Sequence, residues 1–131
     1  MSPLFAACAT VVFMTEQITA EVAQAFRSGD MAHVVALVER LPARTRDGNE
    51  TALLAYGLAL HSLRRDREAA AVLRQLVQLK PYVPEYWNNL AITARQVGEF
   101  DAAEDALRHA IALAPNEAQL HYHLGLLHAQ Q

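Results

Sequence analysis

The chain has six histidines, and their spacing decides whether they could hold a metal ion, because neutral imidazole is a common metal ligand. His121 and His123 are two residues apart, so in a helix their side chains point in different directions. His121 and His128 lie two helical turns apart, too far to share one ion without a further ligand. We therefore predict no metal site and interpret the histidines as solvated or packed at the edge of a core.

The other reactive side chains do not form a catalytic set. The single cysteine, Cys8, has no recognisable base or helix N-terminus beside it, and it cannot form a disulfide within the chain. The sequence contains no glycine-rich phosphate loop, no nucleophile elbow and no carboxylates at catalytic spacing. We therefore predict a protein that is not an enzyme and uses no cofactor.

Composition and charge indicate one globular domain that does not bind polyanions. The 131 residues are 53% hydrophobic and 19% charged, which is enough to bury a core and too apolar for disorder. The net charge of −3 makes nucleic acid and anionic membranes poor partners. Arg64, Arg65, Arg67 and Arg74 form a local basic patch, which we interpret as a solvated outer surface. The composition favours a bacterial, cytoplasmic protein.

The stretch from Pro84 to Pro115 predicts two amphipathic helices joined by a turn at Gly98. Small and large apolar residues recur at helical spacing on one side of each helix: Trp87, Leu90, Ala91 and Ala94, then Ala103, Leu107, Ala110 and Ile111. Pro115 ends the second helix, because proline cannot continue it. The stretch resembles the tetratricopeptide repeat, whose pattern is W-x2-L-G-x2-Y, then A-x3-F, then P. Ala91 replaces the glycine of that pattern, and Ala94 replaces its tyrosine.

The same pattern recurs along the chain at the family period of about 34 residues. One period back, the counterparts of Trp87, Leu90, Ala91, Ala94, Ala103, Leu107 and Pro115 are Leu53, Tyr56, Gly57, Leu60, Ala69, Leu73 and Pro81. One period forward, Leu90, Ala91 and Ala94 become Leu124, Gly125 and His128. Small residues, large residues and prolines all recur at the same spacing of 34 residues. This agreement is far more specific evidence for a repeat than a single short motif.

The resemblance implies an all-α fold, a right-handed superhelical array of antiparallel helix hairpins of the tetratricopeptide type with about seven helices. We divide the domain, 14–131, into a degenerate hairpin (15–49), two repeats (50–83 and 84–117) and a terminal helix or truncated repeat (118–131). Gly29 lies 35 residues before Arg64, so the turn of the first hairpin departs by one residue from the 34-residue spacing. The loop from Ala43 to Asn49 restores that spacing. Terminal repeats of an array are usually atypical.

Residues 1–13 are apolar and uncharged. They lack the positive segment of a secretory signal and are too few to span a bilayer. We interpret them as a dispensable extension; the alternative is a strand or turn packed on the first hairpin. The first helix of the domain is expected from Thr15 to Arg27, and the second from about Met31 to Leu41.

Polar residues at the turns predict where the helices begin. Asp30, Asn49 and Asp66 are expected N-caps, and Asp101 with Glu104 reads as a capping box. The turn at Arg64 has no glycine where Gly98 stands one repeat later. A left-handed arginine there costs about 1 kcal/mol.

In arrays of this family the first helix of each hairpin lines a concave groove, so the resemblance implies a peptide-binding site there. Side chains facing away from the paired helix are expected to line it: Leu54, Leu58, His61, Asn88, Asn89, Ile92, Arg95, Gln96, Tyr122 and Leu126. This mixture suits an extended peptide, with amides for its backbone, Arg95 for a carboxylate and aliphatic patches for its side chains.

Two specialised grooves of the family do not fit these residues. Asn89 occupies the place where arrays of protein-modifying glycosyltransferases carry a backbone-holding asparagine, but the equivalent residues here are Ala55 and His123. The lysine-rich clamp for chaperone carboxylates is absent too. A generic groove is therefore favoured.

Three functions fit this prediction. The first is a non-catalytic module that binds a protein or peptide. The second is the N-terminal, regulatory or substrate-recruiting part of a larger enzyme of the sulfotransferase, glycosyltransferase or oxygenase type. The third is a scaffold that associates with itself through its C-terminal helix.

Two expectations concern packing. Trp87 is predicted to stabilise the array between its own hairpin and the preceding one. The last helix has Leu120, Leu124 and Leu127 along one side but no second helix after it. We expect Leu127, His128 and their neighbours to be covered by a downstream domain, a second copy or residues 1–13 folding across.

Overall fold

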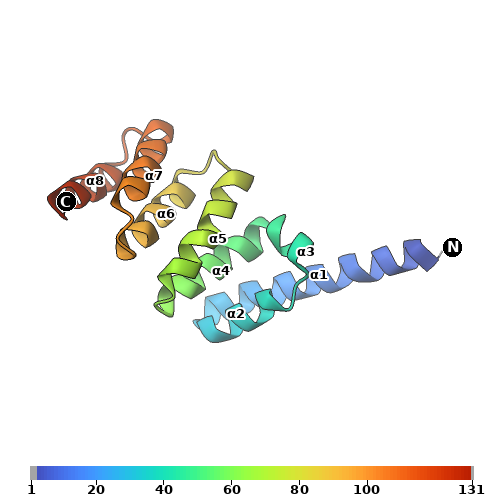
Figure 1. Cartoon of the computed structure of the whole chain (residues 1–131). Coiled ribbons are helices and arrows are strands. Elements are labelled where there is room, and N and C mark those ends of the chain that lie inside the picture. Colours follow the sequence, from blue (N-terminus) through green and yellow to red (C-terminus); the bar gives the residue numbers. More distant parts are fainter. Residues whose placement is uncertain (1–2, 131) are drawn as a thin grey trace.

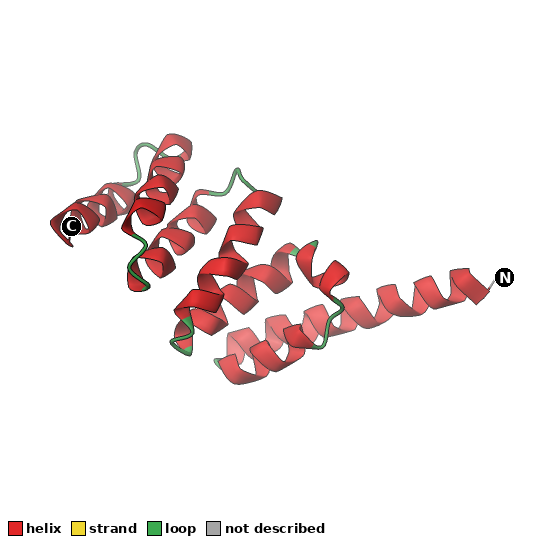
Figure 2. Cartoon of the chain, in the orientation of Figure 1, coloured by secondary structure: helices red, strands yellow, loops and turns green. Residues whose placement is uncertain are grey.

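The computed structural model describes residues 3–130, and the side chains of residues 16–130. The described residues form eight helices and no strand. The helices are α1 Pro3–Ser28, α2 Met31–Glu39, α3 Ala43–Asp47, α4 Glu50–Ser62, α5 Asp66–Leu79, α6 Pro84–Gln96, α7 Phe100–Leu113 and α8 Ala118–Gln130. Figure 2 shows them separated by short loops.

The helices form a row of antiparallel hairpins: α1 with α2, α4 with α5, and α6 with α7. Each second helix also packs against the next first helix, so that α5 lies on α6 and α7 lies on α8. This is the predicted all-α array. The count exceeds the expected seven because α3 occupies most of the stretch that we expected to be a loop, Ala43 to Asn49. Pro42 precedes α3 and Gly48 ends it.

The first helix begins earlier than expected. α1 starts at Pro3 and runs without a break through Thr15, so the alternative of an N-terminal strand or turn was wrong. Figure 1 shows its N-terminal half extending beyond the other helices, at the opposite end of the row from α8. Residues 3–13 therefore do not fold across the C-terminal helix. That residues 1–13 are dispensable stays a prediction.

The core consists of two clusters that meet at α4 and α5. The first cluster joins α1, α2 and α4, and it buries four residues of α2 together with Leu41 after it: Val34, Val35, Leu37 and Val38. The second joins α5, α6 and α7 with parts of α4 and α8. The small residues Ala91 and Ala103 are almost fully buried there, which lets α6 and α7 approach closely.

The last helix is better covered than we expected. Leu120 and Leu127 are buried within the chain itself, and His128 donates from Nε2 to Glu104 Oε1 at 3.0 Å. The expectation that another partner covers Leu127 was therefore wrong, whereas the His128 side chain is 49% exposed and its cover by another partner stays a prediction. The side of α8 that contacts α7 is already closed.

Two of the predicted helix caps are confirmed. Asp30 accepts a hydrogen bond from the backbone N–H of His33 (3.2 Å), and Asn49 accepts one from Ala52 (3.0 Å). Each satisfies a donor that the first turn of a helix leaves unpaired.

The other two caps were wrong, because the N-cap lies one residue before Asp66 and two residues before Asp101. α5 begins at Asp66 itself, with Arg65 before it, and α7 begins at Phe100, with Glu99 before it. Asp66 and Asp101 therefore lie inside the first turn of their helices. Glu104 accepts instead from Arg108 and His128.

Three hairpin turns need a left-handed residue, and one of them lacks glycine. Gly29 and Gly98 have φ of 84° and 83°, while Arg64 has φ of 64° at the equivalent place between α4 and α5. A Cβ in this conformation crowds the following carbonyl oxygen, which costs roughly 1 kcal/mol. The strain suspected from the sequence is thus present.

We expect Arg64→Gly to raise the free energy of unfolding by about 0.5–1 kcal/mol, because it removes this crowding. Chemical denaturation monitored by circular dichroism measures the change. The matched control is Gly98→Ala, which introduces the same strain into the next turn and is expected to destabilise. An Arg64→Gly variant less stable than the parent chain would contradict the argument.

Candidate functional site: the face of the first helices

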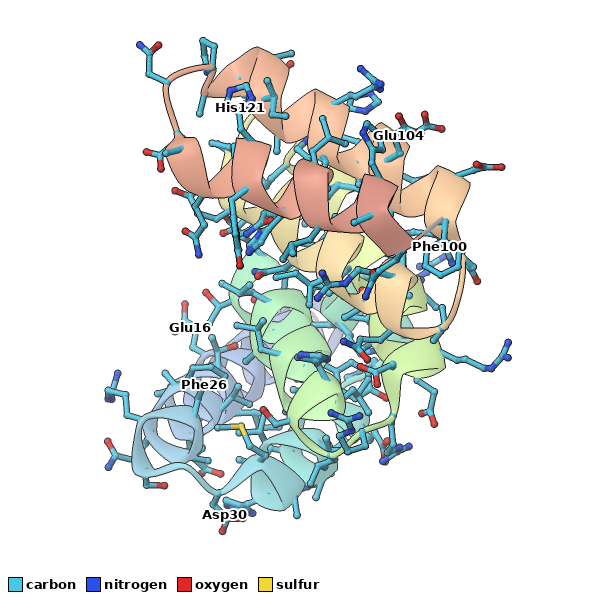
Figure 3. The ribbon with its side chains drawn as sticks, turned by 90° about the vertical axis from the view of Figure 1, so that its left-hand side faces the viewer. Glu16, Phe26, Asp30, Phe100, Glu104 and His121 are labelled. Atoms are coloured by element: carbon cyan, nitrogen blue, oxygen red, sulfur yellow. The ribbon has the colours of Figure 1, made fainter. Side chains whose placement is uncertain are left out.

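An apolar pocket lies between the first helices of the first two hairpins. It has a volume of about 190 Å³, and it is lined by Ala23, Phe26, Arg27, Thr51, Leu54, Ala55 and Leu58. Phe26, labelled in Figure 3, comes from α1, and Leu54 and Leu58 come from α4. Arg27 is exposed and donates to Gln24 (3.1 Å). The pocket can accept an aliphatic or aromatic side chain, with a positive charge nearby.

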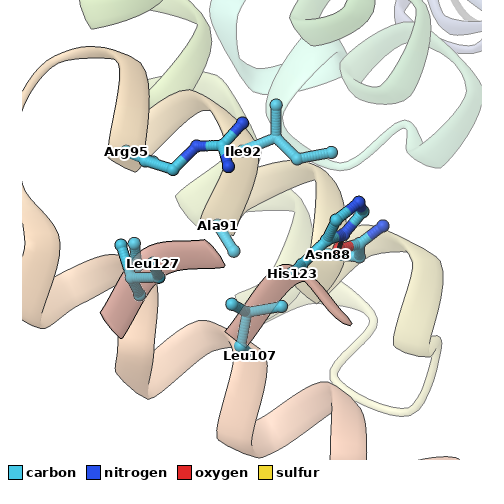
Figure 4. A pocket seen from close by; sticks show the side chains of 8 residues that line it. Asn88, Ala91, Ile92, Arg95, Leu107, His123 and Leu127 are labelled. Carbon is cyan, nitrogen blue, oxygen red and sulfur yellow. Dashed lines mark hydrogen bonds between the residues drawn. The ribbon is translucent and has the colours of Figure 1, made fainter. Parts of the chain in front are cut away.

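A second, narrower cleft lies where α6, α7 and α8 meet (Figure 4). Asn88, Ile92 and Arg95 reach it from α6, and His123 and Leu127 reach it from α8. His123 Nδ1 donates to Asn88 Oδ1 at 3.0 Å, which joins α8 to α6. The cleft therefore combines an amide, a guanidinium and aliphatic walls.

Arg95 provides the positive charge of this cleft. Burial, and then the nearby Arg95 charge, lower the pKa of His123 below its ordinary value of 6.5, which favours the neutral imidazole. Arg95 is half-buried, and no carboxylate of the described residues lies within ion-pair distance of its guanidinium. A half-buried guanidinium without a carboxylate partner is suited to hold an anionic group of a ligand.

A hydrogen bond between the two repeats fixes the spacing of the helices that carry the two pockets. Tyr86 Oη of α6 donates to Glu50 Oε1 of α4 at 2.5 Å. Burial, followed by this bond to a carboxylate, raises the pKa of Tyr86 to about 12. The phenol therefore remains protonated, and remains a donor, throughout the physiological range.

The predicted groove residues divide into three groups. Leu54 and Leu58 line the first pocket, and Asn88, Ile92 and Arg95 line the second. His61 is instead engaged at the end of its own helix, where Nδ1 donates to Asp66 Oδ1 at 2.5 Å.

The remaining four predicted residues, Asn89, Gln96, Tyr122 and Leu126, line neither pocket. Gln96 is exposed, as are Tyr122 and Leu126 on α8.

Sequence reasoning missed several residues that line the two pockets. Phe26 of α1 was not among the predicted groove residues, because the first hairpin is degenerate and its groove positions were not counted. His123 has the register of Asn89 one repeat later, and that relation could have placed it beside Asn88.

Five of the six histidine side chains form hydrogen bonds within the described residues. His109 and His121 donate to backbone carbonyls of Asp105 and Pro115, and His123 donates to Asn88. Within residues 16–130, no three histidine, cysteine or carboxylate side chains gather in a way that could hold a metal ion. No described helix is long and apolar enough to cross a membrane.

The central hairpin matches a sequence family. The family model for the tetratricopeptide repeat matches residues 84–117, which contain α6, α7 and the Arg95 side of the second cleft. Residues 84–117 are a tetratricopeptide repeat. No protein among the curated sequences matches the chain.

Solved structures extend the fold to the rest of the chain. MamA from Desulfovibrio magneticus RS-1 superimposes with a TM-score of 0.81 at 20% identity, over 88% of this chain and 65% of that one. The chain therefore spans somewhat less than two thirds of MamA. The first tetratricopeptide domain of Spaghetti (RPAP3), bound to the HSP90 peptide SRMEEVD, superimposes at 0.78 with 11% identity, over 88% of this chain and 91% of that one.

The type III secretion chaperone SycD of Yersinia enterocolitica, in complex with a peptide of the translocator YopD, is also similar. It superimposes with a TM-score of 0.76 at 16% identity, over 88% of this chain and 92% of that one. At these identities the similarity establishes the fold: the whole array has the tetratricopeptide-repeat architecture.

Proposed function

We propose that this tetratricopeptide array is a non-catalytic interaction module that binds an extended segment of another protein across α1, α4 and α6. The observation that carries the proposal is Arg95: its guanidinium is half-buried in a cleft and has no carboxylate partner among the described residues. Keeping an unpaired charge partly out of water costs stability, and a ligand anion offsets that cost.

The chemistry of the two pockets defines the segment. Arg95 would hold a carboxylate, and Asn88 lies beside it with an amide that can bond to peptide backbone. The apolar pocket of Leu54, Leu58 and Phe26 would take an aliphatic or aromatic side chain. We therefore expect a segment with an acidic residue and a large apolar residue some residues apart.

Two structural neighbours support this proposal because their structures contain bound peptides. SycD was solved with a peptide of YopD, and the Spaghetti domain with a peptide of HSP90. Both hold peptides on the same architecture. The sequence of the segment that this chain recognises is set by its own pockets.

The experiment is a selection of random peptides displayed on phage against the full chain, followed by affinity measurement on the enriched peptides. We expect enrichment of acidic residues together with Leu, Ile, Phe or similar side chains. Arg95→Ala is expected to weaken the binding of an enriched peptide about tenfold or more, because a charge-assisted hydrogen bond contributes roughly 1.5–3 kcal/mol. Fluorescence anisotropy of the labelled peptide measures this.

Arg108→Ala is the matched control. Arg108 lies exposed on α7, pairs with Glu104 and lines neither pocket, so its removal is expected to leave affinity unchanged. Leu58→Ala tests the apolar pocket independently. Enriched peptides that bind the Arg95 and Leu58 variants as tightly as the parent chain would refute this groove as the binding site.

A further inference from the structure

The first helices of the three hairpins carry a basic residue at the same place. Arg27 of α1, His61 of α4 and Arg95 of α6 are each the next-to-last residue of their helix, at a spacing of 34 residues in the sequence. Antiparallel hairpins stacked in a row give these three helices about the same direction (Figure 1). The three residues therefore lie along one edge of the face that the first helices share.

The helix dipole does not by itself account for this position. A positive charge is stabilised at the C-terminus of any helix, and the second helices α2 and α5 are indeed followed by Arg40 and Lys80, one residue past their ends. Within their last turns, however, α2, α5 and α7 have no basic residue. Among the helices of these hairpins, only the first helices place the charge inside the last turn, where Arg27 and Arg95 line the two pockets.

Arg27 is available to a ligand, as Arg95 is. Its exposed guanidinium donates to Gln24 Oε1 at 3.1 Å and forms no ion pair with a carboxylate of the described residues. The N–H groups that Gln24 does not use can hold a ligand carboxylate. The groove thus offers one anion-binding side chain at its α1 end and one at its α6 end.

The place between the two arginines is already neutralised by the protein. His61 Nδ1 donates to Asp66 Oδ1 at 2.5 Å, and the Asp66 side chain is only 12% exposed. An acidic ligand residue at this point would meet the field of the Asp66 carboxylate behind the imidazole, and like charges repel. The charges along this edge therefore favour a ligand with an acid at each end and a neutral stretch between them.

The separation of Arg27 and Arg95 sets the spacing of the two acids. α4 lies between α1 and α6 and contacts both. Because the axes of packed helices lie about 8–10 Å apart, the two arginines are separated by roughly 16–20 Å. An extended chain rises about 3.3 Å per residue, so roughly five or six residues span this distance.

We propose that the segment bound by this array carries two acidic residues five or six positions apart, one held by Arg27 and the other by Arg95. The acid at Arg27 adjoins the large apolar residue of the segment, because Arg27 lines the same pocket as Leu54 and Leu58. This inference rests on the proposed function and deepens it: it names a second charged residue of the ligand and the direction in which the segment crosses the helices.

The probe is a fluorescein-labelled copy of the peptide that phage display enriches most strongly against the full chain. We expect its sequence to contain a large apolar residue beside one acid, and a second acid five or six positions away. Replacing the acid beside the apolar residue by alanine is expected to weaken binding about two- to fivefold, because the pair with exposed Arg27 is partly screened by solvent. Fluorescence anisotropy measures the affinities.

Exchange of charges identifies the arginine that each acid meets. Arg27→Glu is expected to weaken the probe about five- to twentyfold, because a repulsion of similar size replaces the attraction. A peptide with lysine in place of the acid beside the apolar residue is expected to recover this loss on Arg27→Glu, and to recover nothing on Arg95→Glu. Arg40→Glu is the matched control: it makes the same charge change just after α2, lines neither pocket and is expected to bind the probe like the parent chain.

Several results would overturn this inference while leaving the proposed function intact. They are an enriched peptide with a single acid or with acids at another spacing, an Arg27→Glu variant that binds the probe like the parent chain, and a loss on Arg27→Glu that the lysine peptide does not recover. By contrast, a selection that enriches no peptide, or a probe that is insensitive to Arg95→Ala and Leu58→Ala, would refute the groove itself and this inference with it.

Discussion

Trp87→Ala is expected to lower the free energy of unfolding by about 2–4 kcal/mol, somewhat less than the roughly 3–5 kcal/mol lost when a fully buried aromatic residue is truncated, because Trp87 is only partly buried. Its indole stacks on the His109 ring, with centroids 4.2 Å apart, and its Nε1–H donates to the backbone carbonyl of Pro81 at 2.9 Å. His109 belongs to the same hairpin and Pro81 to the loop before it. The residue therefore joins two successive repeats, as the sequence predicted.

Thermal melts followed by circular dichroism measure the loss, which corresponds to a fall in melting temperature of roughly 10 °C. Trp87→Phe is the control: it keeps a stacking ring but loses the bond to Pro81, and about 1 kcal/mol of stability with it. An unchanged melting temperature for Trp87→Ala would show that the residue does not stabilise the array.

Gly57→Ala is expected to destabilise the chain by about 1–3 kcal/mol, the usual cost of overpacking a core. The added methyl group would lie 2.7 Å from Leu73 Cδ2 and 2.9 Å from Leu73 Cγ. Leu73 is completely buried, so it cannot swing away without displacing its neighbours. The clash outweighs the gain of roughly 0.5–1 kcal/mol that alanine normally brings to a helix interior.

Gly125→Ala makes the same chemical change at the same repeat position, in open space. Here the helix gain of about 0.5–1 kcal/mol is expected alone, so this variant should be more stable than the parent chain. Denaturant titrations at low protein concentration compare the two. Equal changes in the free energy of unfolding for Gly57→Ala and Gly125→Ala would contradict the argument that a covering second helix makes Gly57 intolerant of a side chain.

The periodicity of the sequence predicted most of the fold. Spacing of small and large apolar residues placed the hairpins, since helix packing depends on one stripe of side chains per helix. Asp30 and Asn49 were identified as caps because capping is local. The register errors at Asp66 and Asp101 arose where an acidic residue is equally favourable at the N-cap and in the first turn.

The candidate site was predicted only in outline. The repeat register placed Leu54, Leu58, Asn88, Ile92 and Arg95 on the first helices, where they line two separate pockets. The part that α1 contributes was missed, because its hairpin departs from the repeat.

By itself, the sequence determined the helix pairs, their order and the repeat period, because all three follow from side-chain periodicity and from breaking residues such as Pro81 and Pro115. Only the tertiary structure decided whether residues at the same repeat position have the same packing environment. Gly57, Ala91 and Gly125 share a register, yet one lies against a buried leucine, one is closely covered and one is open. Likewise, only the tertiary structure showed that Arg95 lies in a cleft with His123 and has no carboxylate of the described residues at ion-pair distance. Such differences depend on neighbours from other elements, which a local pattern does not encode.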